Sequence, residues 1–159
     1  GLCDRRHAAG TESVPGVNRI PEGTAPREIP VGVLAYIGDA VFELAARMRV
    51  AGDMKMPSGA MHQGAVKMVR ACAQARAARA IQPMLTEEEQ AIYRRARNHA
   101  VTSSPRNADP VEYRMATGFE AVVGFLYLQN RDRRLDEIIQ AAFAACETEA
   151  AGTSGENNP

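Results

Sequence analysis

Apolar residues recur along this chain with the period of an α-helix, and no segment alternates as a β-strand would. Over residues 31–50, Leu34, Ile37, Val41 and Leu44 follow one another at three- and four-residue steps. Similar patterns predict further helices over residues 58–81, 86–100, 110–129 and 133–149. The pattern therefore predicts an all-α bundle.

Polar residues at the ends of these segments indicate where the helices begin. Pro30 opens the first helix, and Ser58 is a good N-cap for the second. Residues 86–89 (TEEE) form a capping-box sequence, and Asp109 can cap the fourth helix. Residues 119–128 are apolar nearly all round, so we expect this part of the fourth helix to be the most buried.

The two ends of the chain differ in composition from the middle. Residues 1–29 contain several Pro and Gly and show no apolar period, so we expect a flexible leader. Residues 151–159 (AGTSGENNP) are typical of a disordered tail. The sequence thus predicts one folded domain over residues 30–150.

Composition excludes several classes of protein. The 159 residues are 45% hydrophobic with a formal net charge of zero, so no global basic field indicates a nucleic-acid partner. Three separated cysteines, Cys3, Cys72 and Cys146, argue against a disulfide scaffold or a zinc site. No apolar stretch is long enough for a membrane span or a secretory signal, and we expect a cytoplasmic protein without membrane association.

Two carboxylates stand out because each lies inside an apolar helical run. Asp39 follows Gly38, and Glu120 lies within residues 116–128. Ionised carboxylates avoid apolar surroundings unless they are paired or bind a cation. Folding that brings the two together would create a site for a hard cation such as Mg2+. The alternatives are structural: a solvent-facing Asp39 beside a packing glycine, and a buried ion pair between Glu120 and Arg114.

A basic region forms the second candidate site. Charge alone is more typical of a solvated helix face, but the polar loop at 101–109 favours binding of phosphate backbones. His62 and His99 lack partners at metal-binding spacing, and we interpret neither as a ligand. The candidate RNA-binding residues are Arg94, Arg95, Arg97, Asn98, Arg106, Asn107 and Arg114.

Several motifs in succession resemble a known family. Residues 34–44 (LAYIGDAVFEL) and 119–128 (FEAVVGFLYL) are similar to the two signature helices of the ribonuclease III family. The resemblance is closer to the Mini-ribonuclease III branch, which consists of the catalytic domain alone. It covers about residues 30 to 143 and includes LTEEE (85–89), RRARN (94–98), PRNAD (105–109) and YRMATGFEA (113–121).

The resemblance implies a homodimeric α-helical endonuclease. Such an enzyme cuts double-stranded RNA with Mg2+, for which Mn2+ can substitute, and leaves 5′-phosphate ends. In bacteria the Mini branch is associated with maturation of 23S ribosomal RNA precursor ends. By position, Asp39 and Glu120 match the catalytic, metal-binding acids of the two signature helices. The domain at 30–150 would then be the catalytic domain.

The sequence also departs from the longer ribonuclease III proteins. Gly32, Ala35 and Thr117 occupy positions where those proteins carry further acids, which predicts a thinner set of metal ligands. Ala96 replaces a glycine that is usual in the Mini branch. No double-stranded-RNA-binding domain follows the matching region, so we expect the basic region to bind the RNA and to recognise the shape of the duplex. The alternatives are a non-catalytic double-stranded-RNA-binding protein of the same fold and a purely structural helical protein.

Overall fold

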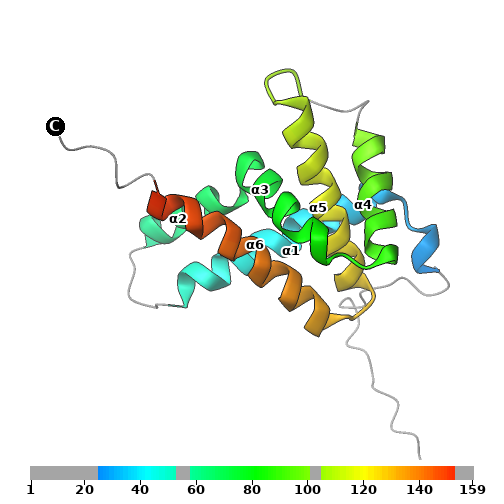
Figure 1. Ribbon diagram of the computed structural model, residues 1–159. Coiled ribbons are helices and arrows are strands. Elements are labelled where there is room, and N and C mark those ends of the chain that lie inside the picture. Colours follow the sequence, from blue (N-terminus) through cyan, green and yellow to red (C-terminus); the bar gives the residue numbers. More distant parts are fainter. Residues whose placement is uncertain (1–24, 53–57, 101–104, 153–159) are drawn as a thin grey trace, which may run out of the picture.

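A computed structural model describes residues 25–52, 58–100 and 105–152. Within these ranges the chain is α-helical throughout, with two short 3-10 helices and no strand, as the sequence predicts (Figure 1). None of the described helices is long and apolar enough to cross a membrane. The elements are the 3-10 helices η1 (Pro26–Glu28) and η2 (Gln82–Met84), and the α-helices α1 (Val31–Ala51), α2 (Ser58–Val69), α3 (Ala71–Ile81), α4 (Glu87–His99), α5 (Pro110–Leu128) and α6 (Asp132–Gly152).

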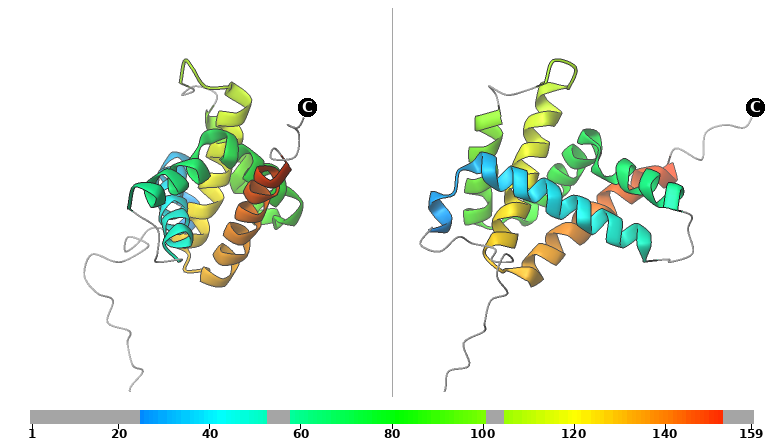
Figure 2. Two further views of the ribbon diagram at one scale, coloured as in Figure 1. Left: turned by 90° about the vertical axis from the view of Figure 1, so that its left-hand side faces the viewer. Right: turned by 180° about the vertical axis from the view of Figure 1, so that it is seen from behind.

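Helix α5 is the centre of the domain. It packs against α1, α3, α4 and α6, and the views in Figures 1 and 2 show it between α1 on one side and α6 on the other. Phe119 and Phe125 are almost completely inaccessible to solvent, and Phe42 of α1 meets Phe119 edge-on with ring centroids 5.0 Å apart. Among the described residues, the apolar stretch at 119–128 is therefore the most buried, as the sequence predicts.

The prediction of one helix over residues 58–81 is wrong in one respect, because the structure divides this segment into α2 and α3. Arg70 adopts an extended conformation (φ −60°, ψ 146°) between them. No Gly or Pro marks this break in the sequence. The two halves pack against different partners: α2 lies against α1, whereas α3 lies against α5 and α6. Tertiary packing thus overrides the local helical pattern.

The ends of the expected folded domain differ slightly from the sequence prediction. Ile29, the last residue of the expected leader, is buried in the hydrophobic core. At the other end, α6 continues to Gly152, two residues into the expected tail. Residues 1–24 and 153–159, on which the rest of these two expectations falls, lie outside the described part of the chain.

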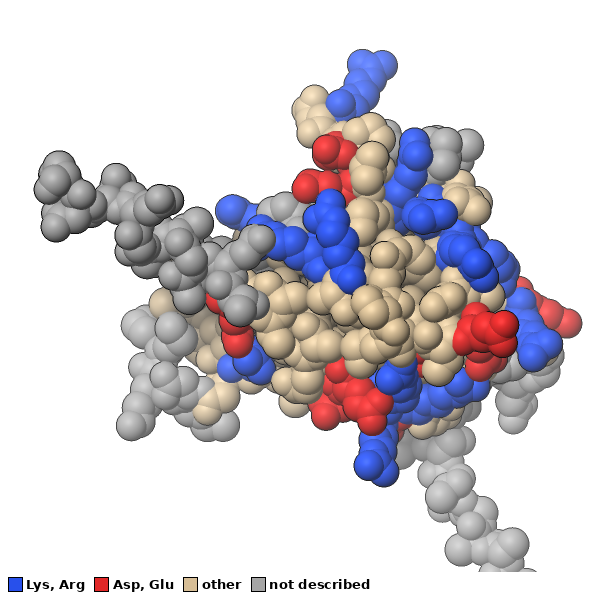
Figure 3. All heavy atoms as spheres, viewed as in Figure 1, with Lys and Arg blue, Asp and Glu red and all other residues tan. Residues whose placement is uncertain are grey.

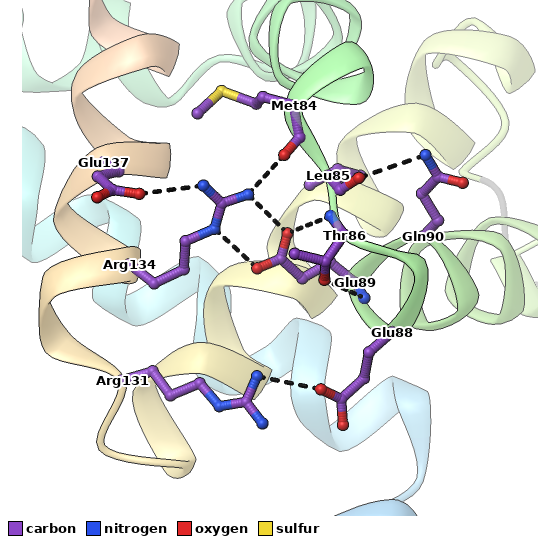
Figure 4. Close-up of polar contacts among 9 residues, drawn as sticks. All are labelled: Met84, Leu85, Thr86, Glu88, Glu89, Gln90, Arg131, Arg134 and Glu137. Carbon is purple, nitrogen blue, oxygen red and sulfur yellow. Dashed lines mark hydrogen bonds and ion pairs between the residues drawn. The ribbon is translucent and has the colours of Figure 1, made fainter.

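The predicted capping box also anchors a buried ion pair. Thr86 Oγ1 accepts a hydrogen bond from the Glu89 backbone, and Glu89 Oε2 accepts one from the Thr86 backbone at 2.8 Å. Arg134 of α6 donates to both Glu89 oxygens at 2.8 and 2.9 Å and to the Met84 carbonyl at 2.6 Å (Figure 4). Burial opposes ionisation of Glu89, but these hydrogen bonds outweigh it and lower the pKa. The pair fixes α6 against α4 and η2.

Helices α1 and α5 cross in backbone-to-backbone contact at two glycines. A Cβ atom on Gly38 would lie 1.7 Å from the Glu120 carbonyl oxygen, and one on Gly124 would lie 1.9 Å from the Leu34 carbonyl oxygen. Both distances are far shorter than atoms tolerate, so only glycine permits this crossing. The contact sets Asp39, which follows Gly38, beside Glu120.

We expect Gly38→Ala and Gly124→Ala each to destabilise the domain by about 3 kcal/mol or more, because the added methyl must push two backbones apart. Urea unfolding measures the change. Gly59→Ala is the matched control, since a Cβ there meets nothing within 4 Å. We expect that change to be neutral or stabilising by up to about 1 kcal/mol. Equal stability of all three variants would contradict the close crossing.

Candidate active site

The two carboxylates singled out in the sequence line one cavity of about 480 Å3. Asp39 comes from the middle of α1 and Glu120 from the middle of α5. Gln74 from the first turn of α3 and His99 from the last turn of α4 complete the polar wall. Four helices therefore converge on one polar site that is otherwise lined largely by small residues.

The environment of Glu120 strongly favours its neutral form. Burial, and then the negative charge of Asp39, raise the pKa of Glu120 to about 8. A hydrogen bond from the Gln74 side chain lowers this pKa, but too little to reverse the shift. Two carboxylates close enough to repel one another in a partly dry cavity form a site where a cation is electrostatically favoured.

Asp39 is the more exposed of the two carboxylates, and its pKa is also raised. Burial is the main cause, the charge of Glu43 adds to it, and a hydrogen bond from Gln74 opposes it. Glu43 forms an ion pair with Arg47, at 2.8 Å. The negative charge of Glu43 therefore raises the pKa of Asp39, while the ion pair with Arg47 holds the Glu43 side chain in place.

Gln74 is the residue of this site that the sequence did not reveal as functional. It is only 4% exposed, and its side-chain amide lies close enough to Asp39 and Glu120 to lower the pKa of each. One buried amide thus lies beside two acidic side chains that repel each other. A signal existed, because Gln74 is a single amide in the otherwise apolar and Ala-rich run at 71–75.

The positions where longer relatives were expected to carry acids also line this cavity. Gly32 and Ala35 of α1 and Thr117 of α5 all contribute to its wall. The Thr117 hydroxyl donates a hydrogen bond to the Tyr113 carbonyl of its own helix, at 2.8 Å. The described residues contain no group of three or more His, Cys, Asp or Glu side chains placed to hold a metal. The acidic residues that line this cavity are therefore Asp39 and Glu120.

This donor set fits a hard, well-hydrated cation. Asp39 and Glu120 offer oxygen atoms, the ligands that Mg2+ prefers, and Mg2+ commonly takes only one or two carboxylates while keeping several waters. The cavity leaves room for such waters beside the two carboxylates. A cation would also remove the charge repulsion that now raises the pKa of Glu120.

The structural alternative for Glu120 is wrong. Helical geometry puts Arg114 and Glu120 about 120° apart around α5, and Glu120 forms no ion pair with any described residue. The alternative for Asp39 is half right. Gly38 is a packing glycine and Asp39 is exposed, but Asp39 also shares a cavity with Glu120.

The predicted basic region surrounds the upper part of α4 and the start of α5. Figure 3 shows Lys and Arg side chains gathered along α4 on the face turned to the viewer. None of the seven candidate RNA-binding residues lines the carboxylate cavity, although His99, at the end of the same helix, does. The seven are Arg94, Arg95, Arg97 and Asn98 on α4, Arg106 and Asn107 before α5, and Arg114 on α5.

Comparison with known proteins places this helical domain and its two-carboxylate site in a class. The model of the Ribonuclease III domain matches residues 32–131, which include α1, α5 and both carboxylates. A crystal structure of a Fusobacterium nucleatum protein is similar to this chain with a TM-score of 0.67 and 28% identity, over 74% of this chain and 94% of that one.

Other similar proteins belong to a single branch of this family. Mini-ribonuclease 3 of Symbiobacterium thermophilum is 43% identical over 74% of this chain and 90% of its own length. Mini-ribonuclease 3 of Clostridium tetani is 42% identical over 79% of this chain and 83% of its own length. The chain therefore belongs to the Mini-ribonuclease 3 branch of the ribonuclease III family, which is a family of endoribonucleases.

We expect Glu120→Gln to stabilise the metal-free protein in a pH-dependent way. The folded wild type holds the Glu120 proton up to about pH 8, whereas the unfolded chain loses it near the ordinary pKa of 4.5. The wild type therefore loses stability between these two pH values, and the glutamine variant does not. The gain should be small at pH 5 and up to about 4 kcal/mol above pH 8.

Thermal or urea unfolding in a chelator at pH 5 and pH 8.5 measures this difference. Asp136→Asn, which changes an exposed acid of α6, is the control and should shift stability equally at both pH values. A Glu120→Gln effect that is independent of pH would show that Glu120 is not held neutral.

Proposed function

We propose that this protein is a Mg2+-dependent endonuclease that cuts double-stranded RNA as a homodimer, leaves 5′-phosphate ends and matures 23S ribosomal RNA precursor ends in the cytoplasm. The observation that carries the proposal is the meeting of Asp39 and Glu120 in one cavity, beside Gln74. Membership of the Mini-ribonuclease 3 branch supports the same reaction.

Each residue of the cavity has a role in this proposal. Asp39 and Glu120 would hold Mg2+, for which Mn2+ can substitute. The bound cation would activate a water for attack on the phosphodiester and stabilise the leaving oxygen. Gln74 fixes the orientation of both carboxylates through its amide. Gly32 and Ala35 line the cavity without bulky side chains, which would leave room in it for a backbone phosphate.

The proposed RNA-binding residues are Arg94, Arg95, Arg97, Asn98, Arg106, Asn107 and Arg114. Arginine forks and amides suit phosphate oxygens and the 2′-hydroxyl groups of an RNA duplex. Arg94 and Arg95 are exposed on α4, and Arg106 is exposed in the segment before α5. This exposure supports contact with the backbone of a duplex rather than with single bases.

An exposed apolar stripe on α1 supports the homodimer. Val33, Tyr36, Leu44 and Met48 are 46–79% exposed and recur at helical spacing along one side of the helix. An apolar cavity of about 460 Å3 between α1 and α6 continues this surface. Tyr36 also lines the carboxylate cavity, so a second copy on this stripe would lie beside the active site. A twofold dimer would present two such sites to the two strands of a duplex.

We expect Asp39→Asn and Glu120→Gln each to reduce cleavage of a long RNA duplex in Mg2+ by about a hundredfold or more, because each removes one of two charged ligands of the cation. A gel assay of cleavage rates measures the loss. Glu87→Gln is the matched control, since Glu87 is an exposed acid of α4 that does not line the cavity. It should retain most of the activity.

Equal cutting by wild type and Asp39→Asn would refute the catalytic assignment. Binding of the duplex by the wild type without any cutting would instead favour the non-catalytic RNA-binding protein of the same fold. Absence of any salt-dependent RNA binding would favour the structural alternative, because phosphate contacts weaken as salt concentration rises.

We expect the wild type to sediment as a dimer at micromolar concentration and Leu44→Asp with Met48→Asp to sediment as a monomer. Charged side chains on the apolar stripe would have to be buried without partners in the dimer. Val66→Asp on α2 changes another exposed apolar residue and is the control. A monomeric wild type would contradict the dimer but would leave the carboxylate site untouched.

A further inference from the structure

A second polar cleft lies between η2, α4 and α5. It consists of two adjoining cavities of about 390 and 280 Å3 that share Gln82, Tyr93 and Arg97. The larger also contains Asn98 and Arg114, and the smaller contains Arg94. We call this the Tyr93 cleft. None of its lining residues also lines the carboxylate cavity.

The Tyr93 cleft is cationic. Arg94, Arg97 and Arg114 line it, no Asp or Glu does, and none of the three arginines forms an ion pair within the described part of the chain. Burial raises the pKa of the Tyr93 hydroxyl, while the charges of Arg97 and Arg79 oppose that shift. A fourth arginine, Arg79 of α3, therefore also acts on this cleft. The positive charge of the cleft favours the binding of an anion.

Two buried donors in the cleft have no hydrogen-bond partner among the described residues. They are the Tyr93 hydroxyl and Nε of Arg114. Tyr93 is 2% exposed, and the nearby Gln82 amide does not meet the geometry of a hydrogen bond to its hydroxyl. An unsatisfied buried polar group costs about 1–3 kcal/mol. Arginine can only donate, so whatever satisfies Nε must bring an acceptor oxygen.

Packing holds the Tyr93 hydroxyl in place. The ring lies against Gly118, where a Cβ atom would come within 2.6 Å of a ring carbon. Gly118 therefore fixes the ring from the side of α5, and the hydroxyl position cannot relax freely toward another partner. The unsatisfied donors are therefore a consequence of how α4 packs against α5.

The cleft and the carboxylate site lie on opposite faces of α5. At 3.6 residues per turn, Val111, Arg114 and Met115 share one side of the helix, whereas Tyr113, Thr117 and Glu120 share the other. A ligand in the cleft is thus separated from the reacting carboxylates by the body of the helix.

We propose that the Tyr93 cleft binds a phosphate group, held by Arg97, Arg114 and the Tyr93 hydroxyl. A phosphate offers the charge that the arginines favour and the acceptor oxygens that the two buried donors lack. Its source is either a free small phosphate compound or a backbone phosphate of RNA that extends past the active site. Phosphate binding here does not depend on the proposed nuclease activity.

Titration of the full-length protein with inorganic phosphate at constant ionic strength, followed by calorimetry, tests the proposal. We expect Arg114→Gln to weaken binding about tenfold and Tyr93→Phe to weaken it severalfold. Arg133→Gln, an exposed arginine of α6 outside the cleft, is the matched control and should bind as the wild type does. Asp39→Asn should also bind normally, which separates this result from that of the cleavage assay.

A duplex RNA titration of the same variants identifies the source. Weaker RNA binding by Arg114→Gln than by Arg133→Gln, with competition by phosphate, assigns the site to the RNA backbone. Phosphate binding lost in Arg114→Gln with unchanged RNA affinity assigns it to a small phosphate compound. No phosphate binding by the wild type, or equal binding by folded wild type, Arg114→Gln and Tyr93→Phe, would overturn the proposal and leave the cleft as a water site.

Discussion

The backbone contact between α1 and α5 is the constraint on which the rest of the structure depends. Gly38 rests on the Glu120 carbonyl and Gly124 on the Leu34 carbonyl, so the two helices cannot slide or rotate without losing both contacts. The same crossing buries Phe42 against Phe119 and puts Asp39 next to Glu120. Core packing and the candidate active site therefore both depend on the crossing of α1 and α5. Glycine lowers helix propensity by about 1 kcal/mol, and here that loss permits the closest possible approach of two helices.

The crossing also causes charge repulsion between Asp39 and Glu120, which the neighbouring side chains relieve only in part. It brings two acids together in a partly dry cavity, and the pKa of Glu120 rises to about 8 as a result. Gln74 lowers the pKa of both carboxylates, but an amide carries no charge. A buried salt bridge elsewhere in the domain shows the contrasting case, since Arg134 neutralises Glu89 and lowers its pKa. The difference between these two glutamates is consistent with a structural role for Glu89 and supports the proposal that Glu120 binds a cation.

Local signals in the sequence were sufficient for most of the fold. The capping box at Thr86, the Asp109 cap and the apolar run in α5 predicted helix boundaries that the structure confirms. The break at Arg70 could not be predicted, because it arises from packing α2 and α3 against different helices. At the site, an acid inside an apolar run was visible in the sequence for Asp39 and Glu120. Gln74 and His99 were not recognised, because an uncharged amide and a helix-end histidine gain meaning only once α3 and α4 converge on the carboxylates.

The small residues around the carboxylates affect the chemistry as much as the acids do. Additional carboxylates at Gly32, Ala35 or Thr117 would lie in the same cavity and would repel Asp39 and Glu120 further in the absence of a cation. With only two acids the cavity holds less repulsion, but it offers a cation fewer protein ligands. Under the proposed function, water and the phosphate of a bound substrate would complete the coordination shell of the cation. A minimal acid set therefore makes cation binding depend more strongly on the substrate, so that the complete site would form only when RNA is present.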